Sequence, residues 1–225
     1  MGIAGGLGPL AGAHFYRRLV EGTTAGCDAE HLAVVLISDP AIPSRAAHLL
    51  GDGESPVPAL AAVLDRLAAA GATLIAIASS TTHAYYAELA ARSRVPIVHL
   101  LHALGRAAGT AGLRRPGVVA TRATIECRLL DRHMPAGVDL QHPDAPTQER
   151  IQGVIDDVKA GAAPAAAREA MLETLRAPCW EADGFLFACT ETSLLLPLPG
   201  APAPIVSAVD VLVAEVLEQA ARSAA

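Results

Sequence analysis

The chain has 225 residues, a formal net charge of −6 and no basic run, which argues against nucleic acid as a partner. Apolar residues make up 52% of it and aromatic residues only 3%, so the core must be built from Ala, Val, Leu and Ile. No apolar run reaches the roughly 18–20 residues of a membrane span, and the N-terminus lacks a signal-peptide pattern. We therefore expect a soluble, cytoplasmic protein without a membrane partner.

Short apolar runs alternate with helical patterns along the chain, which is typical of βαβ units around a parallel sheet. The strands are predicted at residues 2–5, 32–37, 74–78, 97–100, 118–121, 138–141, 185–188 and 205–207. The helices are predicted at residues 11–23, 58–70, 82–92, 103–111, 124–133, 147–160, 165–176 and 209–224.

A loop-like stretch, GTAGLRRPG at residues 109–117, is followed by a fresh strand and divides this pattern into two similar halves. The last helix is expected to return to the first half. The predicted fold class is therefore α/β, with two similar Rossmann-like domains built on parallel sheets. The first domain comprises residues 1–102 with 205–225, and the second comprises residues 103–204.

Each half contains a strand that runs into reactive side chains and then a helix. The first copy reads ASSTTH at residues 78–83, and the second reads ACTE at residues 188–191. Ligands bind at the carboxyl ends of strands in open α/β sheets, and a helix N-terminus favours an anion such as a carboxylate. The same dipole lowers the pKa of a thiol, so we expect Cys189 to be a thiolate near neutral pH.

The other motifs predict less chemistry. GGLGPL at residues 5–10 matches a dinucleotide fingerprint only loosely, and a tight glycine turn close to a small ligand is the favoured interpretation. Cys27, Cys127 and Cys179 show no CxxC spacing and are interpreted as reduced thiols. The histidines other than His83 are scattered along the chain without the spacing of metal ligands, so no metal site is predicted.

Seven segments together carry a family resemblance: GGLGPLAG, CDAEHLAVVLISDPAIPSRAAHLL, GDGESPVPAL, ASSTTH, VVATRATI, DDVKAG and ACTE. In this order, over essentially the whole chain, they resemble the aspartate/glutamate racemase superfamily, and more closely its aspartate and amino-acid racemase branch. The resemblance implies an active site in the cleft between the two domains and a small amino-acid substrate. It also implies no cofactor, neither pyridoxal phosphate nor a metal, and a homodimer is the expected assembly.

In that family, two cysteines exchange the α-proton of the substrate from opposite faces, one as base and the other as acid. By position, Cys189 matches the second cysteine, whereas Ser79 stands where the first usually lies. Ser80 replaces an asparagine of the family pattern, and both Thr81 and His83 match it.

The resemblance also assigns residues to the carboxylates of the substrate. Arg45 and Lys159 match the basic pair that recognises the side-chain carboxylate in the aspartate-selective branch. Thr124 and Thr190 match positions that contact the α-carboxylate or the α-amino group. Glu191 either forms a hydrogen bond within the site or favours the start of the following helix.

Ser79 leaves the reaction open, because a serine hydroxyl is neither acid nor base at neutral pH unless another group activates it. The main hypothesis is a racemase of aspartate, glutamate or both. One alternative is a single-cysteine decarboxylase or isomerase of a small dicarboxylate, similar to arylmalonate decarboxylase. The others are a Cys-to-Ser variant that still binds the amino acid and a non-catalytic amino-acid-binding protein. Arg45 and Lys159 favour a substrate with a second carboxylate.

Overall fold

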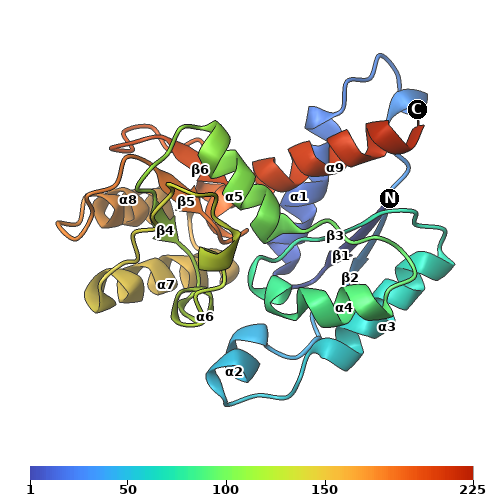
Figure 1. Cartoon of the computed structure of the whole chain (residues 1–225), viewed down its shortest axis with the longest axis horizontal. Coiled ribbons are helices and arrows are strands. Elements are labelled where there is room, and N and C mark those ends of the chain that lie inside the picture. Colours follow the sequence, from blue (N-terminus) through green and yellow to red (C-terminus); the bar gives the residue numbers. More distant parts are fainter. Residues whose placement is uncertain (225) are drawn as a thin grey trace. The chain divides into compact units, whose positions relative to one another are not determined.

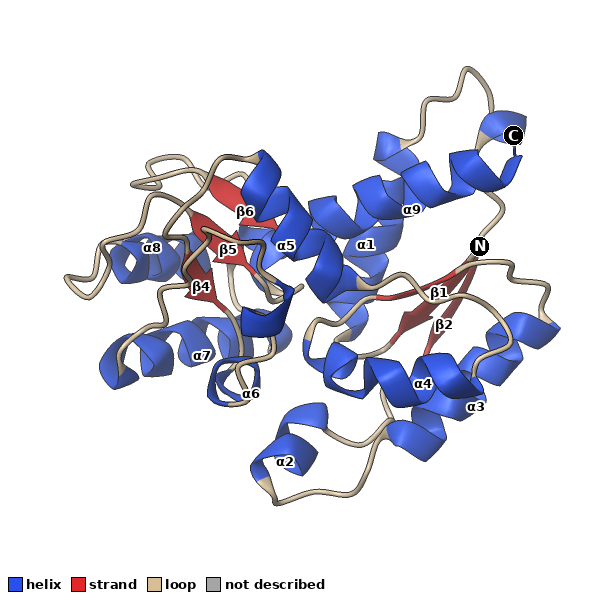
Figure 2. Cartoon of the chain, in the orientation of Figure 1, coloured by secondary structure: helices blue, strands red, loops and turns tan. Residues whose placement is uncertain are grey.

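The structure, a computed structural model, describes the backbone of residues 1–224 and the side chains of residues 1–222. By its internal contacts the chain forms two compact units. The first unit comprises Met1–Leu100 and Val209–Ala225, and the second comprises Leu101–Ala208. Strands alternate with helices in both units (Figures 1 and 2).

The first unit is built on a parallel three-stranded sheet in the order β2-β1-β3. Helices α1 and α9 lie side by side, joined by hydrogen bonds from Arg18 to Asp210, while α3 and α4 pack together and line another part of the core (Figure 1). Successive side chains of a strand point to opposite faces, so Ile75 and Ile77, two residues apart, lie on the same face and belong to the core cluster that contains Leu60 of α3. The strands are β1 (Gly2–Gly5), β2 (Val35–Ser38) and β3 (Ile75–Ile77). The helices are α1 (Pro9–Gly22), η1 (Asp28–Glu30), α2 (Arg45–Leu50), α3 (Val57–Ala69), η2 (Thr81–Tyr85), α4 (Tyr86–Arg92) and α9 (Ala208–Ala224).

The second unit repeats this plan with a parallel sheet in the order β4-β5-β6. Residues of α7 and α8 form one core cluster with Phe185 and Phe187, whereas Leu186, between them, packs against Ala108 of α5. The strands are β4 (Gly117–Val119), β5 (Phe185–Phe187) and β6 (Ile205–Ser207). The helices are α5 (Leu100–Thr110), α6 (Arg122–Glu126), η3 (Asp131–His133), α7 (Ala145–Lys159), α8 (Pro164–Leu175) and η4 (Thr192–Leu195).

The two predicted strands at residues 97–100 and 138–141 are single β-bridges rather than strands. Ile97 pairs with Ile75 beside β3, and Gln141 pairs with Gly117 beside β4. The chain leaves the sheet soon after each bridge, because α5 begins at Leu100 and Pro143 has no N–H to donate. With the bridges included, both sheets have the same order of four segments. The predicted α/β class with two similar parallel-sheet units is confirmed.

Two of the predicted helices are divided, and the α-helix α2 and the 3₁₀ helix η1 were not predicted. Residues 82–92 form the 3₁₀ helix η2 and then α4, while residues 124–133 contain the end of α6 and then η3. The break after α6 includes Arg128, whose φ of 46° lies outside the helical region. Ser44 is the N-cap of α2, because its side chain accepts a hydrogen bond from the Ala47 N–H. The helix has only six residues, which is too short for a helical repeat of apolar residues to be recognised in the sequence.

Candidate active site

The edge of the first unit that carries Ser79 is formed where β3 ends. The Ala78 N–H donates to Ala4 O of β1 at 3.1 Å, which keeps the chain on the sheet for one residue beyond the strand. Ser79 follows and is buried, with 5% of its surface exposed. Ser80, Thr81 and Thr82 are buried as well, and the Ser80 and Thr82 hydroxyl oxygens have no hydrogen-bond partner within residues 1–222. Buried polar atoms normally form hydrogen bonds, so this edge has hydroxyl groups that the fold itself does not need for its own hydrogen bonds.

His83 holds the backbone at Ser79. Its Nδ1 lies 2.9 Å from Ser79 O, and its Nε2 lies 3.2 Å from Val98 O beyond the neighbouring bridge. The ring is 1% exposed, and burial lowers its pKa, which favours the neutral imidazole. A neutral ring has one N–H, so it donates to one of the two carbonyls at a time. His83 therefore positions Ser79 but, among the described side chains, no base is hydrogen-bonded to the Ser79 hydroxyl.

The corresponding edge of the second unit carries Cys189. The Ala188 N–H donates to Val119 O of β4 at 2.9 Å, the equivalent of the bond between Ala78 and Ala4. Cys189 is 4% exposed, and its thiol donates to Glu191 Oε2 at 3.0 Å. The Thr190 hydroxyl donates to the same oxygen at 3.3 Å. The two motifs are thus equivalent in backbone position and differ in the reactive atom and its partner.

The expectation that Cys189 is a thiolate near neutral pH is wrong. Burial raises the pKa of this thiol well above its usual value, and the negative charge of Glu191 raises it further. The positive charge of Lys159 acts in the opposite direction and is a smaller cause. The expected dipole is weak, because η4 has four residues and begins only at Thr192. Cys189 rests as a protonated thiol, which is a proton donor.

Arg45, the first residue of α2, lies in the first unit and binds backbone there. Its guanidinium donates to Leu7 O at 2.8 Å, to Pro43 O at 3.2 Å and to Ile42 O at 3.4 Å. The Tyr85 hydroxyl of η2 lies 3.4 Å from Arg45 O. Arg45 is thereby connected to the β1–α1 turn and to the helix that follows Ser79.

The β1–α1 turn at GGLGPL requires glycine. Gly6 has a φ of +85°, and a Cβ atom there would lie 2.3 Å from Asp39 N, just beyond β2. This close approach accounts for the tight glycine turn expected at this motif.

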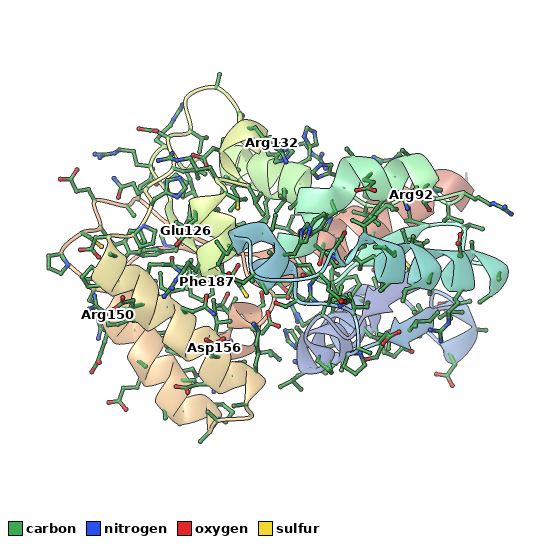
Figure 3. All side chains as sticks on the ribbon, turned by 90° about the horizontal axis from the view of Figure 1, so that it is seen from below. Arg92, Glu126, Arg132, Arg150, Asp156 and Phe187 are labelled. Atoms are coloured by element: carbon green, nitrogen blue, oxygen red, sulfur yellow. The ribbon has the colours of Figure 1, made fainter. Side chains whose placement is uncertain are left out.

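Lys159 ends α7 in the second unit. Its side chain is 43% exposed, and its Nζ lies 3.9 Å from Asp156 Oδ1. It is the only lysine in the sequence, and its influence on the pKa of Cys189 indicates that it lies near the thiol. Figure 3 labels Arg150 and Asp156 on α7, and Phe187 of β5 belongs to the same core cluster as the buried residues of this helix.

Thr124 and Thr190 are both buried in the second unit. The Thr124 N–H donates to Thr121 Oγ1 at 3.3 Å, so Thr121 is the N-cap of α6. The structure thus groups Cys189, Thr190 and Lys159 in the second unit, and Ser79–Thr81 with Arg45 through Tyr85 in the first. The Glu191 carboxylate accepts a hydrogen bond from the Cys189 thiol, and Glu191 is also the N-cap residue of η4, without a side-chain capping bond.

The four cysteines are free thiols. Within residues 1–222, no three His, Cys, Asp or Glu side chains are arranged to hold a metal ion. None of the described helices has the length and apolar character to cross a membrane.

The family model described as "Asp/Glu/Hydantoin racemase" matches residues 5–216. Aspartate racemase from Picrophilus torridus has a similar structure, with a TM-score of 0.86, 25% identity and coverage of 98% of this chain and 94% of that chain. An aspartate racemase homologue from Pyrococcus horikoshii has a TM-score of 0.76, 19% identity and 98% coverage of both chains. Glutamate racemase from Francisella tularensis, in complex with D-glutamate, has a TM-score of 0.70, 13% identity and coverage of 99% and 81%. The last two show the fold alone.

The family match extends over nearly the whole chain and includes both strand-end motifs. Together with the similarity to aspartate racemase, it supports an isomerase of the amino-acid racemase class. The protein belongs to the Asp/Glu/Hydantoin racemase family.

Proposed function

We propose that the protein racemises an acidic amino acid, aspartate or glutamate, without a cofactor. The observation that carries this proposal is the pair of equivalent strand ends, one presenting Cys189 as a buried thiol and the other presenting Ser79. Racemisation breaks the Cα–H bond on one face and forms a new one on the other. We propose that Cys189 and Ser79 address opposite faces of the same α-carbon.

Cys189 is the proton-transfer residue in this proposal. As a thiol it donates its proton to the substrate carbanion and becomes a thiolate, and in the reverse direction the thiolate removes the α-proton. Burial and Glu191 make that thiolate a strong base, because both disfavour the charged form. On the Ser79 face, water or a neighbouring group carries the proton, since no described base activates the hydroxyl. Exchange is therefore expected to be faster for the enantiomer whose α-hydrogen faces Cys189.

The basic residues support a substrate with a second carboxylate. We propose that Lys159 and Arg45 bind the side-chain carboxylate and that the polar groups of Ser80, Thr81, Thr124 and Thr190 bind the α-carboxylate or the α-amino group. Lys159 supports this role most directly, since its amine is partly exposed and lies near Cys189. Arg45 is fixed in orientation by three backbone carbonyls, and a fixed guanidinium suits a planar carboxylate.

The test is proton exchange at the α-carbon in deuterium oxide. L-aspartate and L-glutamate are incubated separately with the protein, the α-proton signal is followed by NMR, and optical rotation is followed in parallel. A racemase causes loss of the α-proton signal together with loss of optical rotation for at least one of the two. Absence of both changes for both amino acids, at protein concentrations that bind them, would contradict the proposal and support a binding protein.

A single observation favours a second candidate, a decarboxylase of a small dicarboxylate. Cys189 rests as a donor, and Ser79 lacks a base, which is the arrangement needed to protonate a carbanion from one face only. In that reaction the bond between the α-carbon and a carboxylate breaks, carbon dioxide leaves, and the Cys189 proton is transferred to the carbanion. Release of carbon dioxide from substituted malonates, without α-proton exchange in amino acids, would identify this activity.

A further inference from the structure

The Glu191 carboxylate uses only one of its two oxygens. Oε2 accepts hydrogen bonds from the Cys189 thiol at 3.0 Å and from the Thr190 hydroxyl at 3.3 Å. Oε1 is buried and has no hydrogen-bond partner within residues 1–222, and the whole residue is 5% exposed. A buried charged oxygen without a donor is costly and is rare in folded proteins. Such an oxygen indicates a donor that the chain itself does not supply.

The nearby cations do not meet this need. Lys159, whose charge acts on Cys189, has its Nζ next to Asp156 and is partly exposed rather than paired with Glu191. Arg168, at the start of α8, donates through Nε to Leu195 O of η4. Among the described side chains, none of the ion pairs includes Glu191. The missing partner is therefore a positively charged or strongly donating group of a ligand.

We propose that Glu191 Oε1 binds the α-ammonium group of the substrate, a role that rests on the proposed amino-acid racemase function. The amine is attached to the same α-carbon with which Cys189 exchanges its proton. A group that holds the amine must therefore lie close to the Cys189 sulfur, as Glu191 does. One carboxylate thereby orients the thiol through Oε2 and the substrate through Oε1. An ammonium–carboxylate contact is a charge-assisted hydrogen bond, which is stronger than a neutral one.

The arrangement matches the charges of an amino acid. Glu191 provides a buried anion for the amine, and Lys159 provides a cation for a carboxylate in the same unit. Binding of the ammonium also offsets the negative charge of Glu191, which is one cause of the high pKa of the Cys189 thiol. Substrate binding thus eases ionisation of the thiol beside it, whereas a ligand without an amine leaves the thiol fully protonated. Glu191 selects amino acids over diacids that lack the amine.

The experiment compares three ligands with the same carbon chain that differ only in one substituent at the α-carbon. Aspartate, malate and succinate carry two carboxylates and an amine, a hydroxyl or a hydrogen at the α-carbon. If glutamate is the amino acid that exchanges, the series is glutamate, 2-hydroxyglutarate and glutarate. Dissociation constants are measured by calorimetry for the wild-type protein, for Glu191→Gln and for the control Glu169→Gln, an exposed position on α8.

The inference predicts that the wild-type protein binds the amino acid at least about tenfold more tightly than the diacid without an amine, as expected for a hydrogen bond between charged groups. Glu191→Gln is expected to lose at least about tenfold in affinity for the amino acid and to bind the diacid at least as tightly as the wild type, because the diacid has no amine contact to lose and the substitution removes a buried negative charge. Glu169→Gln is expected to keep both affinities.

Equal losses for the amino acid and the diacid, or an unchanged affinity for the amino acid with slower α-proton exchange, would overturn the inference, since Glu191 would then act only on Cys189. If Glu191→Gln does not fold, the wild-type comparison decides, and equal affinity for the amino acid and the diacid overturns the inference. Each of these three results leaves the racemase proposal intact when exchange is observed. Absence of binding by all three ligands overturns the racemase proposal together with the inference.

Discussion

Replacement of Gly6 by alanine tests how the β1–α1 turn is held. Gly6 has a φ of +85°, and a Cβ there would lie 2.3 Å from Asp39 N and 2.4 Å from Asp39 C, which are rigid backbone atoms. An L-residue in the left-handed region costs about 1–2 kcal/mol, and forced overpacking costs about 1–3 kcal/mol. Gly6→Ala is therefore expected to lower the free energy of unfolding by about 2–5 kcal/mol.

Gly51 offers a matched control in the same unit. Its φ is +99°, but a Cβ there would meet no atom within 4 Å. Gly51→Ala should therefore show only the conformational cost of about 1–2 kcal/mol. Urea unfolding at neutral pH, followed by circular dichroism, gives the free energy of unfolding for both variants and the wild type. An equal cost for the two variants would refute the close approach of the turn to Asp39, and with it the position of Leu7 O that Arg45 binds.

Three further outcomes follow from the charges near the two motifs. The pKa of Cys189 in the folded protein is raised above its ordinary value of 9.0, so its contribution to stability is complete below pH 9 and is lost as the pH rises toward the folded pKa. Urea unfolding from pH 7 to 10.5 should therefore show a smaller loss of unfolding free energy for Cys189→Ser than for the wild type. Equal losses would contradict a raised pKa of this thiol. Burial lowers the pKa of His83 from 6.5, so the protein loses stability as the pH falls below about 6.5. His83→Gln should therefore lose less unfolding free energy between pH 7 and 5 than the wild type. The same pH dependence of unfolding free energy in both proteins would contradict a neutral, buried ring. Lys159→Met removes a positive charge that lowers the pKa of the Cys189 thiol, so alkylation of Cys189 by iodoacetamide at pH 9 should be slower than in the wild type and in the control Arg150→Met. Peptide mass spectrometry measures the rate at Cys189. An equal rate in Lys159→Met would show that Lys159 does not act on the thiol.

Much of the fold could be predicted from the alternation of apolar runs and helical patterns, because apolar runs form the fully buried strands β1, β3, β4 and β5. Prediction from the sequence fails where the same apolar run is compatible with either a strand or a helix. Residues 97–100 are apolar enough for a strand, yet the chain makes one bridge at Ile97 and enters α5 at Leu100. An apolar run of this length does not distinguish a strand from the start of a buried helix. Helix α2 depends on a cap at Ser44 rather than on a repeat.

The strand-end positions of Ser79 and Cys189 could be predicted from the sequence, whereas the protonation state of Cys189 could not. The repeated motifs correctly place Ser79 and Cys189 at equivalent strand ends. The expectation of a thiolate was wrong because burial and the Glu191 charge outweigh a weak dipole at the end of a short 3₁₀ helix. Both of these causes depend on the folded surroundings of one sulfur atom. The partners of Arg45 were likewise unpredictable, since Leu7 is distant in sequence.

The central claim is that Cys189 transfers the α-proton of an acidic amino acid and that Ser79 occupies the position of its missing partner. The most direct measurement is the rate of α-proton exchange for L-aspartate and L-glutamate in deuterium oxide with wild type, Cys189→Ala and Ser79→Cys. We expect measurable exchange with the wild type, a loss of at least about 10²-fold with Cys189→Ala, and faster exchange with Ser79→Cys, since a positioned thiol then serves the second face. Exchange that persists in Cys189→Ala at the wild-type rate would contradict the account.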